Sequence, residues 1–194
     1  MFVTFEGLDG SGKTTQAGLF VERLRADGRD VLATREPGGT PLGERIRQLL
    51  LHGSDLSPWA ETALFAAARA ELVAAVIRPA LEAGSDVVCD RYLDSSLAYQ
   101  GIARGLGLDR VLELNLAVVD GLLPERTFVL LVDPAEAAAR SRRTRDRIER
   151  EGADFHAALD RAYRELAARF PDRILALDGS GAPDEVAERV AAAL

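Results

Sequence analysis

Cysteine, long apolar runs and excess positive charge are all scarce in this 194-residue sequence. The single cysteine, Cys89, cannot form a disulfide within the chain, and its place in an apolar run fits an inert core residue in a reducing compartment. No run approaches the roughly 18 apolar residues of a membrane span, and the start Met1–Phe5 lacks the basic and apolar segments of a signal peptide. We therefore expect a cytoplasmic globular protein with no membrane partner.

Net charge excludes a further class of partner. The chain has 24 Lys and Arg residues against 31 Asp and Glu, which gives a net charge of −7. General binding to duplex nucleic acid depends on neutralising many phosphates, so we expect no nucleic-acid partner. Any phosphate site must be local. Lysine is the scarcest basic residue, because Lys13 is the only one and all other basic side chains are arginines.

Short apolar runs alternate with longer amphipathic stretches along the chain. This alternation predicts an α/β fold with a five-stranded parallel sheet flanked by helices. The chain is long enough for one domain, and residues 1–194 carry no repeat or low-complexity linker. We expect helices to begin near Pro41, Pro58 and Pro183, and the Pro58–Ala83 helix to end at Gly84. The expected strands are Phe2–Glu6, Val31–Thr34, Asp86–Asp90, Thr127–Val132 and Arg173–Leu177.

The lone lysine belongs to a phosphate-binding motif. Residues 7–14, GLDGSGKT, match G-x-x-x-x-G-K-[ST] directly after one expected strand and directly before a helix. Glycines let backbone amides surround phosphate oxygens, and the helix N-terminus faces the same anion. The compact ammonium of Lys13 can follow the β- and γ-phosphates, whereas a planar guanidinium does not suit that loop. The expected ATP-binding residues are Gly7, Leu8, Asp9, Gly10, Ser11, Gly12, Lys13, Thr14 and Thr15.

A phosphate-binding loop is shared by GTPases, ATP-driven machines and small-molecule kinases. The N-K-x-D guanine motif of GTPase switches needs a second lysine, and the sequence has none. A machine would need a larger partner surface or a second domain, for which the chain has little length. A kinase instead needs a second pocket for an acceptor and cations around the transferred phosphoryl group.

That second pocket is indicated by residues 90–100, DRYLDSSLAYQ, which follow an apolar strand. The pattern D-R-Y-x-x-S-S-x-A-Y-Q resembles the signature of thymidylate kinases, and residues 34–40, TREPGGT, resemble the second strand and loop of that family. The resemblance covers essentially the whole chain. It implies a P-loop NTPase fold of the nucleoside monophosphate kinase type with a short lid.

The resemblance implies roles around the phosphates. Asp90 ends a strand at the edge where the phosphate loop lies, so it can hold Mg²⁺ through water while Thr14 offers its hydroxyl to the ion. Arg91 can grip the acceptor phosphate with paired hydrogen bonds. Arg47 is similar to the second phosphate-binding arginine of the family, with Arg35 as an assistant. A strand-end cap for Asp90 and a solvated helix charge for Arg47 remain open.

The acceptor nucleoside is expected to meet a second group of residues. Phe65 and Arg69, spaced i, i+4, can place a stacking ring and a donor to pyrimidine O4 on one helix face. In isolation Phe65 would more simply be a core residue. The remaining expected contacts are Ser96 and Gln100 at N3, Tyr99 beside the sugar, Asp9 at the 3′-hydroxyl, and Glu36, whose bond to Pro37 is a candidate cis peptide.

An arginine-rich segment follows the fourth expected strand. Residues 140–150 contain six arginines and two acids, a local charge of +4 in an acidic protein. A solvated helix end is the simpler interpretation. Kinases of this architecture carry a lid there, so residues of about 140–151 are expected to cover the triphosphate and bring cations to it. Arg142, Arg143, Arg145 and Arg147 are candidates, with Arg143 and Arg147 first among them for a catalytic role beside Lys13 and Arg91.

The predicted reaction is transfer of the γ-phosphoryl group from MgATP to dTMP, giving dTDP and ADP. The acceptor phosphate is already ionised, so no general base is needed, and His52 and His156 are interpreted as surface residues. A kinase of another monophosphate such as dUMP, or a nucleotide-dependent binding switch, remains open. The resemblance also implies a homodimer, and the apolar stripe 111–119 fits either an interface or the core.

Overall fold

The computed structural model describes residues 1–140, 147–148 and 150–194. Its centre is a five-stranded sheet in the order β2-β3-β1-β4-β5, and every neighbouring pair is parallel. The predicted α/β fold is therefore confirmed, and each expected strand is found within one residue of its expected ends. The strands are β1 (Phe2–Gly7), β2 (Val31–Arg35), β3 (Asp86–Asp90), β4 (Arg126–Leu131) and β5 (Ile174–Asp178).

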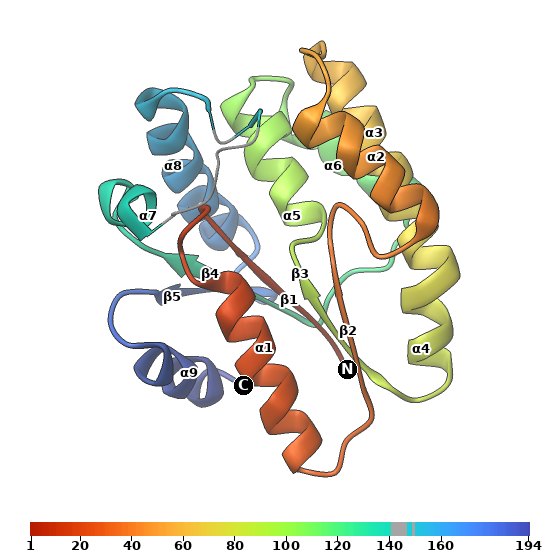
Figure 1. Ribbon diagram of the computed structural model, residues 1–194, viewed down its shortest axis with the longest axis vertical. Coiled ribbons are helices and arrows are strands. Elements are labelled where there is room, and N and C mark those ends of the chain that lie inside the picture. The colour runs from red at the N-terminus through yellow and green to blue at the C-terminus, as the bar shows by residue number, and fades with distance from the viewer. Residues whose placement is uncertain (141–146, 149) are drawn as a thin grey trace.

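Helices cover both faces of this sheet (Figure 1). On one face, α1 and α9 pack over β1 and β5 around the buried side chains of Val3 and Phe5. The opposite face carries a larger core that includes Phe2 and packs against α8. The helices are α1 (Lys13–Ala26), α2 (Pro41–His52), α3 (Pro58–Leu72), α4 (Arg78–Glu82), α5 (Leu93–Ser96), α6 (Leu108–Val118), α7 (Pro134–Arg140), α8 (Ala153–Arg169) and α9 (Pro183–Ala192), with π-helical segments η1 (Val73–Ile77) and η2 (Leu97–Ala103).

The expected helix from Pro58 to Ala83 is interrupted. It begins at Pro58 as predicted, but α3 passes into η1 and continues as α4 before the chain turns at Gly84. Pro79 lies in the second half and has no N–H to donate, while its ring crowds the carbonyl four residues earlier. The wider π turn lies directly before this proline, where the regular α ladder cannot continue unchanged.

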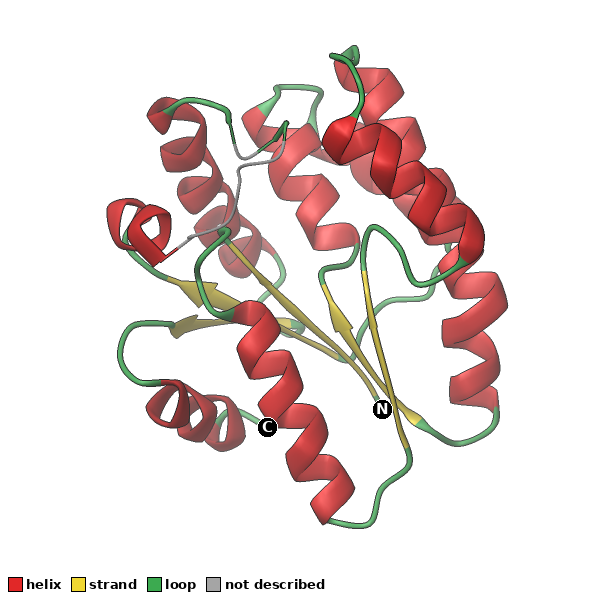
Figure 2. Cartoon of the chain, viewed as in Figure 1, coloured by secondary structure: helices red, strands yellow, loops and turns green. Residues whose placement is uncertain are grey.

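Three loops meet at the carboxyl edge of the sheet (Figure 2). Phe5 of β1 and Arg35 of β2 are both in register with Asp90 of β3, so the chain leaves these three strands at neighbouring points. The Glu36–Pro37 bond after β2 is cis, as its sequence allowed. In an open parallel sheet this edge is where ligands bind.

Two further sequence expectations can be placed. Val111 and Val119 are buried in the core beside η2 and β4, so the ends of the 111–119 stripe belong to the core. Within the described residues, no helix is long and apolar enough to cross a membrane. Most of the expected lid, residues 141–146 and 149, lies outside the described residues.

Candidate active site

The phosphate-binding loop joins β1 to α1 and keeps its shape through glycine. Gly10 and Gly12 have φ of 86° and 91°, the left-handed region that other L-residues rarely adopt. A Cβ at Gly10 would also overlap the carbonyl oxygen of Ala137. Helix α1 begins at Lys13 directly after the loop, so its free N–H groups point toward the same space.

Lys13 lies under this loop and is nearly buried. Its Nζ donates to the Asp9 carboxylate at 3.0 Å and more weakly to the Leu8 carbonyl at 3.4 Å. Arg91 reaches the same Asp9 oxygen from β3 at 2.6 Å. Burial by itself raises the pKa of Asp9, but the charges of Arg91 and Lys13 outweigh it and hold the pKa well below its usual range. One ionised carboxylate therefore positions both cations.

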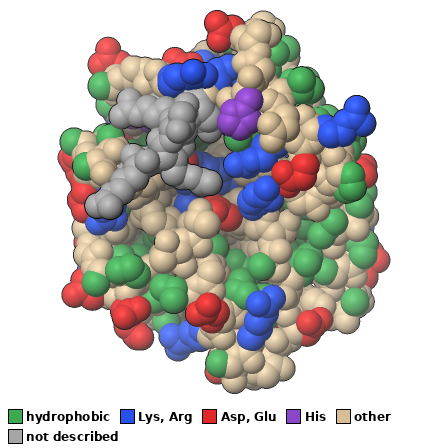
Figure 3. Space-filling view, in the orientation of Figure 1, with side chains coloured by type: hydrophobic (Ala, Val, Ile, Leu, Met, Phe, Trp, Pro, Cys, Tyr) green, Lys and Arg blue, Asp and Glu red, His purple; other side chains and the backbone are tan. Residues whose placement is uncertain are grey.

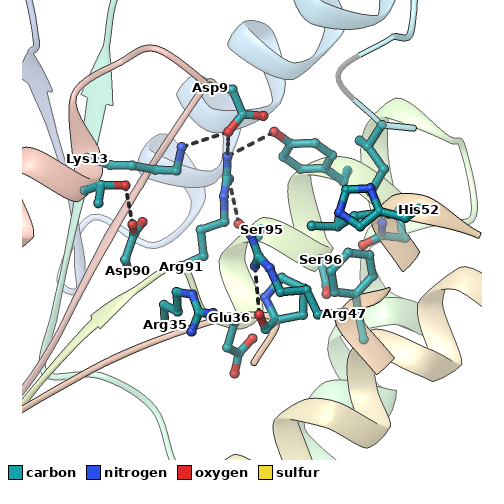
Figure 4. Close-up of a pocket in the computed structure, with 17 residues that line it drawn as sticks. Asp9, Lys13, Arg35, Glu36, Arg47, His52, Asp90, Arg91, Ser95 and Ser96 are labelled. Carbon is teal, nitrogen blue, oxygen red and sulfur yellow. Dashed lines mark hydrogen bonds and ion pairs between the residues drawn. The ribbon is translucent and has the colours of Figure 1, made fainter. Parts of the chain in front are cut away.

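Arg91 is held in an uncommon backbone conformation. Its φ of 69° lies in the left-handed region, and its N–H donates to the Phe5 carbonyl. Such strain at the end of a strand is typical of functional positions. The guanidinium donates to Ser95, to Asp9 and to the hydroxyls of Tyr99 and Tyr163 at 2.6 to 3.4 Å. Figure 4 shows it between Asp9 and Ser95.

Glu6 supports Arg91 from below and was not singled out from the sequence. Its side chain is fully buried and accepts hydrogen bonds from the backbone N–H of Tyr92 and of Ser95 and from the hydroxyls of Ser95 and Tyr163. Burial raises the pKa of Glu6, and the nearby Arg91 charge opposes that rise. A glutamate inside the mainly apolar strand FVTFEG was the available signal, because a buried carboxylate requires partners.

Two clefts open at the carboxyl edge, and they share residues. The first has a volume of about 530 Å³ and the second about 470 Å³, sizes that suit small-molecule ligands. Asp9, Lys13 and Thr14 line both. Blue basic side chains gather around a hollow on this face in Figure 3. Two anionic ligands placed in these clefts would therefore meet at Lys13.

The first cleft gathers most of the predicted acceptor residues. Arg47 turns its guanidinium toward the cis peptide and donates to the Pro37 carbonyl at 2.8 Å (Figure 4). Arg35 is half-exposed and pairs with Glu44. His52, interpreted as a surface residue, is exposed but also contributes to the cleft wall, whereas His156 is half-buried. The sequence-predicted residues that line the cleft are Asp9, Lys13, Thr14, Arg35, Glu36, Arg47, Phe65, Asp90, Arg91, Ser96, Tyr99 and Gln100.

Arg69 is placed differently from its expectation. It is 1% exposed, does not line the cleft, and donates twice to Glu36 and once each to Ser96, Asn115 and the Tyr92 carbonyl. A guanidinium has five N–H groups, so all of them are directed to protein acceptors here. The predicted donation to pyrimidine O4 would require one of these bonds to be shared. In this geometry Arg69 supports the cleft floor.

Its main partner, Glu36, does face the cleft. Burial raises the pKa of Glu36 to about 7 although the Arg69 charge opposes the shift. Its Oε2 accepts from Arg69 at 2.5 and 2.8 Å, while its buried Oε1 has no hydrogen-bond partner among the described residues. An unpaired buried carboxylate oxygen in a cleft wall is an acceptor that a ligand can satisfy.

Thr14 and Asp90, the two residues expected to hold Mg²⁺, are in direct contact. The Thr14 hydroxyl donates to Asp90 Oδ2 at 2.5 Å, and the buried Oδ1 of Asp90 has no partner within the described part of the chain. Hydroxyl and carboxylate oxygens are the ligands that Mg²⁺ takes, usually with several waters. The described residues contain no group of three or more His, Cys, Asp or Glu side chains able to hold a metal.

The second cleft adjoins the outer side of the phosphate loop. Gly10 to Thr15 line it together with Gln16, Arg140, Gly179 and Gly181 of the loop before α9, and Pro183 at the start of α9. Gln16 was not predicted; its Nε2 donates to the Pro183 carbonyl at 2.7 Å, which joins the two walls. Gly7, the last residue of β1, and Leu8, which follows it, line neither cleft.

The arginine-rich segment can be placed only in part. Arg143, Arg142 and Arg145 lie outside the described residues. Arg147 is described, but it lines neither cleft. It donates to the Leu50 carbonyl at 2.9 Å and to Glu61 at 2.6 Å, and its side chain is 9% exposed. The arrangement fits an anchoring contact better than the expected catalytic contact with a phosphoryl group, because the charge is already paired.

A parallel sheet, a lysine-bearing phosphate loop and an adjoining acceptor cleft define a P-loop kinase of the nucleoside monophosphate type. A family model described as thymidylate kinase matches residues 5–190. The chain belongs to the thymidylate kinase family.

Individual relatives agree with that assignment along the whole chain. A thymidylate kinase of Synechococcus sp. strain JA-2-3B'a(2-13) is 51% identical over 190 residues, covering 98% of this chain and 92% of the relative. A thymidylate kinase of Deinococcus radiodurans is 45% identical, and the match covers 100% of this chain and 96% of the relative. The crystal structure of thymidylate kinase from Ehrlichia chaffeensis superimposes with a TM-score of 0.83 at 33% identity, covering 100% of this chain and 97% of that one.

Proposed function

We propose that this protein transfers the γ-phosphoryl group of MgATP to dTMP, giving ADP and dTDP. The observation that carries the proposal is the meeting of the two clefts at Asp9, Lys13 and Thr14. The second cleft, against the phosphate loop, takes ATP, and the first takes dTMP. The donor phosphate and the acceptor phosphate then face each other beside Lys13.

The reaction needs alignment and charge stabilisation more than proton transfer. An oxygen of the ionised dTMP phosphate attacks the γ-phosphorus, and the bond to the β-phosphate oxygen breaks as ADP leaves. Lys13 stabilises charge on the β- and γ-phosphates, and Arg91 holds the acceptor phosphate with help from Arg47. Arg91 is pre-positioned for this by Asp9 and Ser95.

Mg²⁺ is the expected cofactor, and when bound it would neutralise and orient the triphosphate oxygens. Thr14 and Asp90 would hold it, Asp90 through water. Oδ1 of Asp90 has no hydrogen-bond partner among the residues that the structure describes, which supports this assignment. The lid arginine Arg143 is a further candidate cation, and it lies outside the described residues.

The pyrimidine is read by the wall opposite the phosphate loop. Phe65 offers a stacking face, Ser96 and Gln100 the polar edge, and Tyr99 a boundary beside the sugar. The Tyr99 ring lies under Arg91, with 5.4 Å between the guanidinium carbon and the ring centre. The residue beside the sugar and the residue that binds the phosphate are therefore in contact. Glu36 and Asp9 supply additional acceptors for the nucleotide.

The rival acceptor dUMP differs from dTMP by one methyl group. Burying a methyl contributes only about 1 kcal/mol, so we expect preference for dTMP and not strict exclusion of dUMP. A nucleotide-dependent binding switch would instead hydrolyse ATP slowly without an acceptor product. The acceptor cleft, whose walls are already formed, favours the kinase.

The test is to incubate the purified protein with MgATP and each nucleoside monophosphate in turn and to identify products by mass. We expect dTDP to form fastest, with ADP release that depends on the acceptor. ADP release that is the same with and without any monophosphate would reject the kinase and support the switch.

A homodimer in the cytoplasm completes the proposal. Leu42 and Leu49 of α2 and Trp59 of α3 are 45%, 56% and 38% exposed, which leaves apolar surface available for a second copy. The free, buried Cys89 fits a reducing compartment. Light scattering of the purified protein should give twice the chain mass of 20.9 kDa; a mass of one chain would reject the dimer.

A further inference from the structure

Glu61 lies behind the acceptor cleft and binds three side chains at once. It belongs to α3, is 1% exposed and does not line the cleft. Its carboxylate accepts from Gln100 Nε2 at 2.9 Å, from Arg104 Nε at 2.7 Å and from Arg147 at 2.6 Å. Of these partners only Gln100 also lines the cleft. Glu61 is thus one contact removed from the ligand.

The carboxylate is held in its ionised form. Burial by itself raises the pKa of Glu61, but the hydrogen bonds from Gln100, Arg104 and Arg147 outweigh burial and lower it. An ionised carboxylate only accepts hydrogen bonds. The amide group of Gln100 must therefore turn its nitrogen toward Glu61, which removes the usual ambiguity between the two amide orientations.

The orientation of the amide decides what the cleft can recognise. With Nε2 committed to Glu61, Oε1 is the remaining polar atom of the Gln100 side chain, and Gln100 lines the cleft. An acceptor at this place favours a ligand edge that carries an N–H group. Thymine and uracil carry a hydrogen on N3, whereas N3 of cytosine is itself an acceptor and would be repelled.

We propose that Glu61 is a positioning residue that fixes the Gln100 amide so that the acceptor cleft selects pyrimidines with an N3–H over cytosine. The inference rests on the proposed function, because it concerns the base of the acceptor nucleotide. Discrimination of this kind is strong, since the wrong base leaves a buried acceptor facing another acceptor.

A purely structural role for Glu61 makes a different prediction. Glu61 also has an anchoring role, because it binds Arg104 and Arg147. Arg104 in turn reaches Glu151 at 2.9 Å, and Arg147 reaches the Leu50 carbonyl. Loss of that anchoring alone would change stability or turnover for all acceptors equally. A change in the ratio of dTMP to dCMP utilisation is expected only if Glu61 acts through the Gln100 amide.

The experiment compares Arg147→Gln with the double variant Glu61→Gln/Arg147→Gln. The single variant keeps the carboxylate and its bond to Gln100. The double variant removes the carboxylate without leaving Arg147 as an unpaired cation, and Arg104 keeps Glu151 as its partner. A glutamine at position 61 both donates and accepts, so the Gln100 amide is free to turn over.

We expect the ratio of kcat/KM for dTMP to that for dCMP to fall about tenfold from the single to the double variant. The fall should come from a higher KM for dTMP and a lower KM for dCMP, with kcat for dTMP within about threefold. A ratio within twofold of the Arg147→Gln value would overturn the proposal.

A second variant, Gln100→Leu, leaves every ion pair of Glu61 in place and tests recognition by the amide even if the double variant does not fold. It should lose discrimination to a similar extent. Where the double variant folds, adding Glu61→Gln/Arg147→Gln to Gln100→Leu should produce no further loss, because Glu61 acts through Gln100. Unchanged discrimination in Gln100→Leu, or additive losses, would overturn the positioning role. If the parent protein does not phosphorylate dTMP, the proposed function itself fails, which is a separate outcome.

Discussion

At the residue scale, Lys13 is the side chain that links the two clefts. It lines both of them, and its described contacts are with Asp9 and the Leu8 carbonyl. Lys13→Ala should lower kcat by about a hundredfold or more, as for loss of a transition-state donor, while circular dichroism and the unfolding temperature remain close to those of the parent.

Lys13→Arg is the matched control for charge. The substitution keeps the cation but replaces a compact ammonium by a planar fork that does not suit the loop. We expect it to be nearly as inactive as Lys13→Ala in steady-state assays. Parent-like turnover in Lys13→Arg would show that charge alone suffices and would contradict the role assigned to the lysine.

Asp9 gives a prediction for pH. Its folded-state pKa is depressed, so its contribution to stability is present above its unfolded pKa of about 3.9 and is lost as pH falls through the folded value. Asp9→Asn should therefore lower the free energy of unfolding by about 1.5–3 kcal/mol at pH 7, with a gap that narrows below about pH 4.

Urea unfolding at a series of pH values measures that gap. Asp55→Asn, at an exposed position before α3, is the control and should stay close to the parent throughout. A gap for Asp9→Asn that widens as pH falls would mean that the carboxylate is not stabilised by Arg91 and Lys13.

At the element scale, the phosphate-binding loop depends on its backbone. Gly10→Ala places a Cβ both at positive φ and against the Ala137 carbonyl. The strain of the left-handed conformation alone costs about 1–2 kcal/mol per residue, and the overlap must in addition displace the loop or α7. We expect Gly10→Ala to weaken ATP binding at least tenfold, measured by titration with a non-hydrolysable analogue.

Gly28→Ala separates strain from function. Gly28 has φ of 78° at the far end of α1, and a Cβ there meets no atom of the described residues within 4 Å. It should lose a similar amount of stability without losing ATP affinity. Equal affinity losses in both variants would contradict a local role for Gly10.

The elements themselves were largely predictable from sequence. Apolar runs such as Asp86–Asp90 and the glycines and prolines at element ends determine local structure, so the strands agree within one residue. The break in the Pro58–Ala83 helix was missed because apolar periodicity does not reveal a π turn. Pro79 is the one signal of an irregularity in that stretch of sequence.

At the scale of the whole molecule, contacts between distant segments determine the partners of charged side chains, which local spacing does not show. The spacing of Phe65 and Arg69 is correct for one helix face, yet Arg69 is directed to Glu36 and Asn115, residues 33 and 46 positions away. Arg147 is likewise held by Glu61 across 86 positions. The sequence shows which side chains are charged. The residue that pairs with each charge depends on the tertiary fold.

The residues that belong to sequence motifs lie close together in the structure, as their positions at strand ends predicted. Lys13 follows β1, while Asp90 ends β3 and Arg91 comes directly after it. These residues are brought together because the neighbouring parallel strands β1 and β3 end at one edge. Their roles toward ligands remain predictions that the variants above test. Glu6 and Tyr163 complete the same cluster from segments that carried no ligand motif.

The central claim is that ATP and dTMP bind end to end and meet at Lys13. A dinucleotide in which adenosine and thymidine are joined through their 5′ positions by an oligophosphate tests it most directly, by calorimetric titration and competition. We predict one dinucleotide per chain, bound more tightly than either nucleotide alone and competed by both ATP and dTMP. Competition by only one of the two nucleotides would contradict the account.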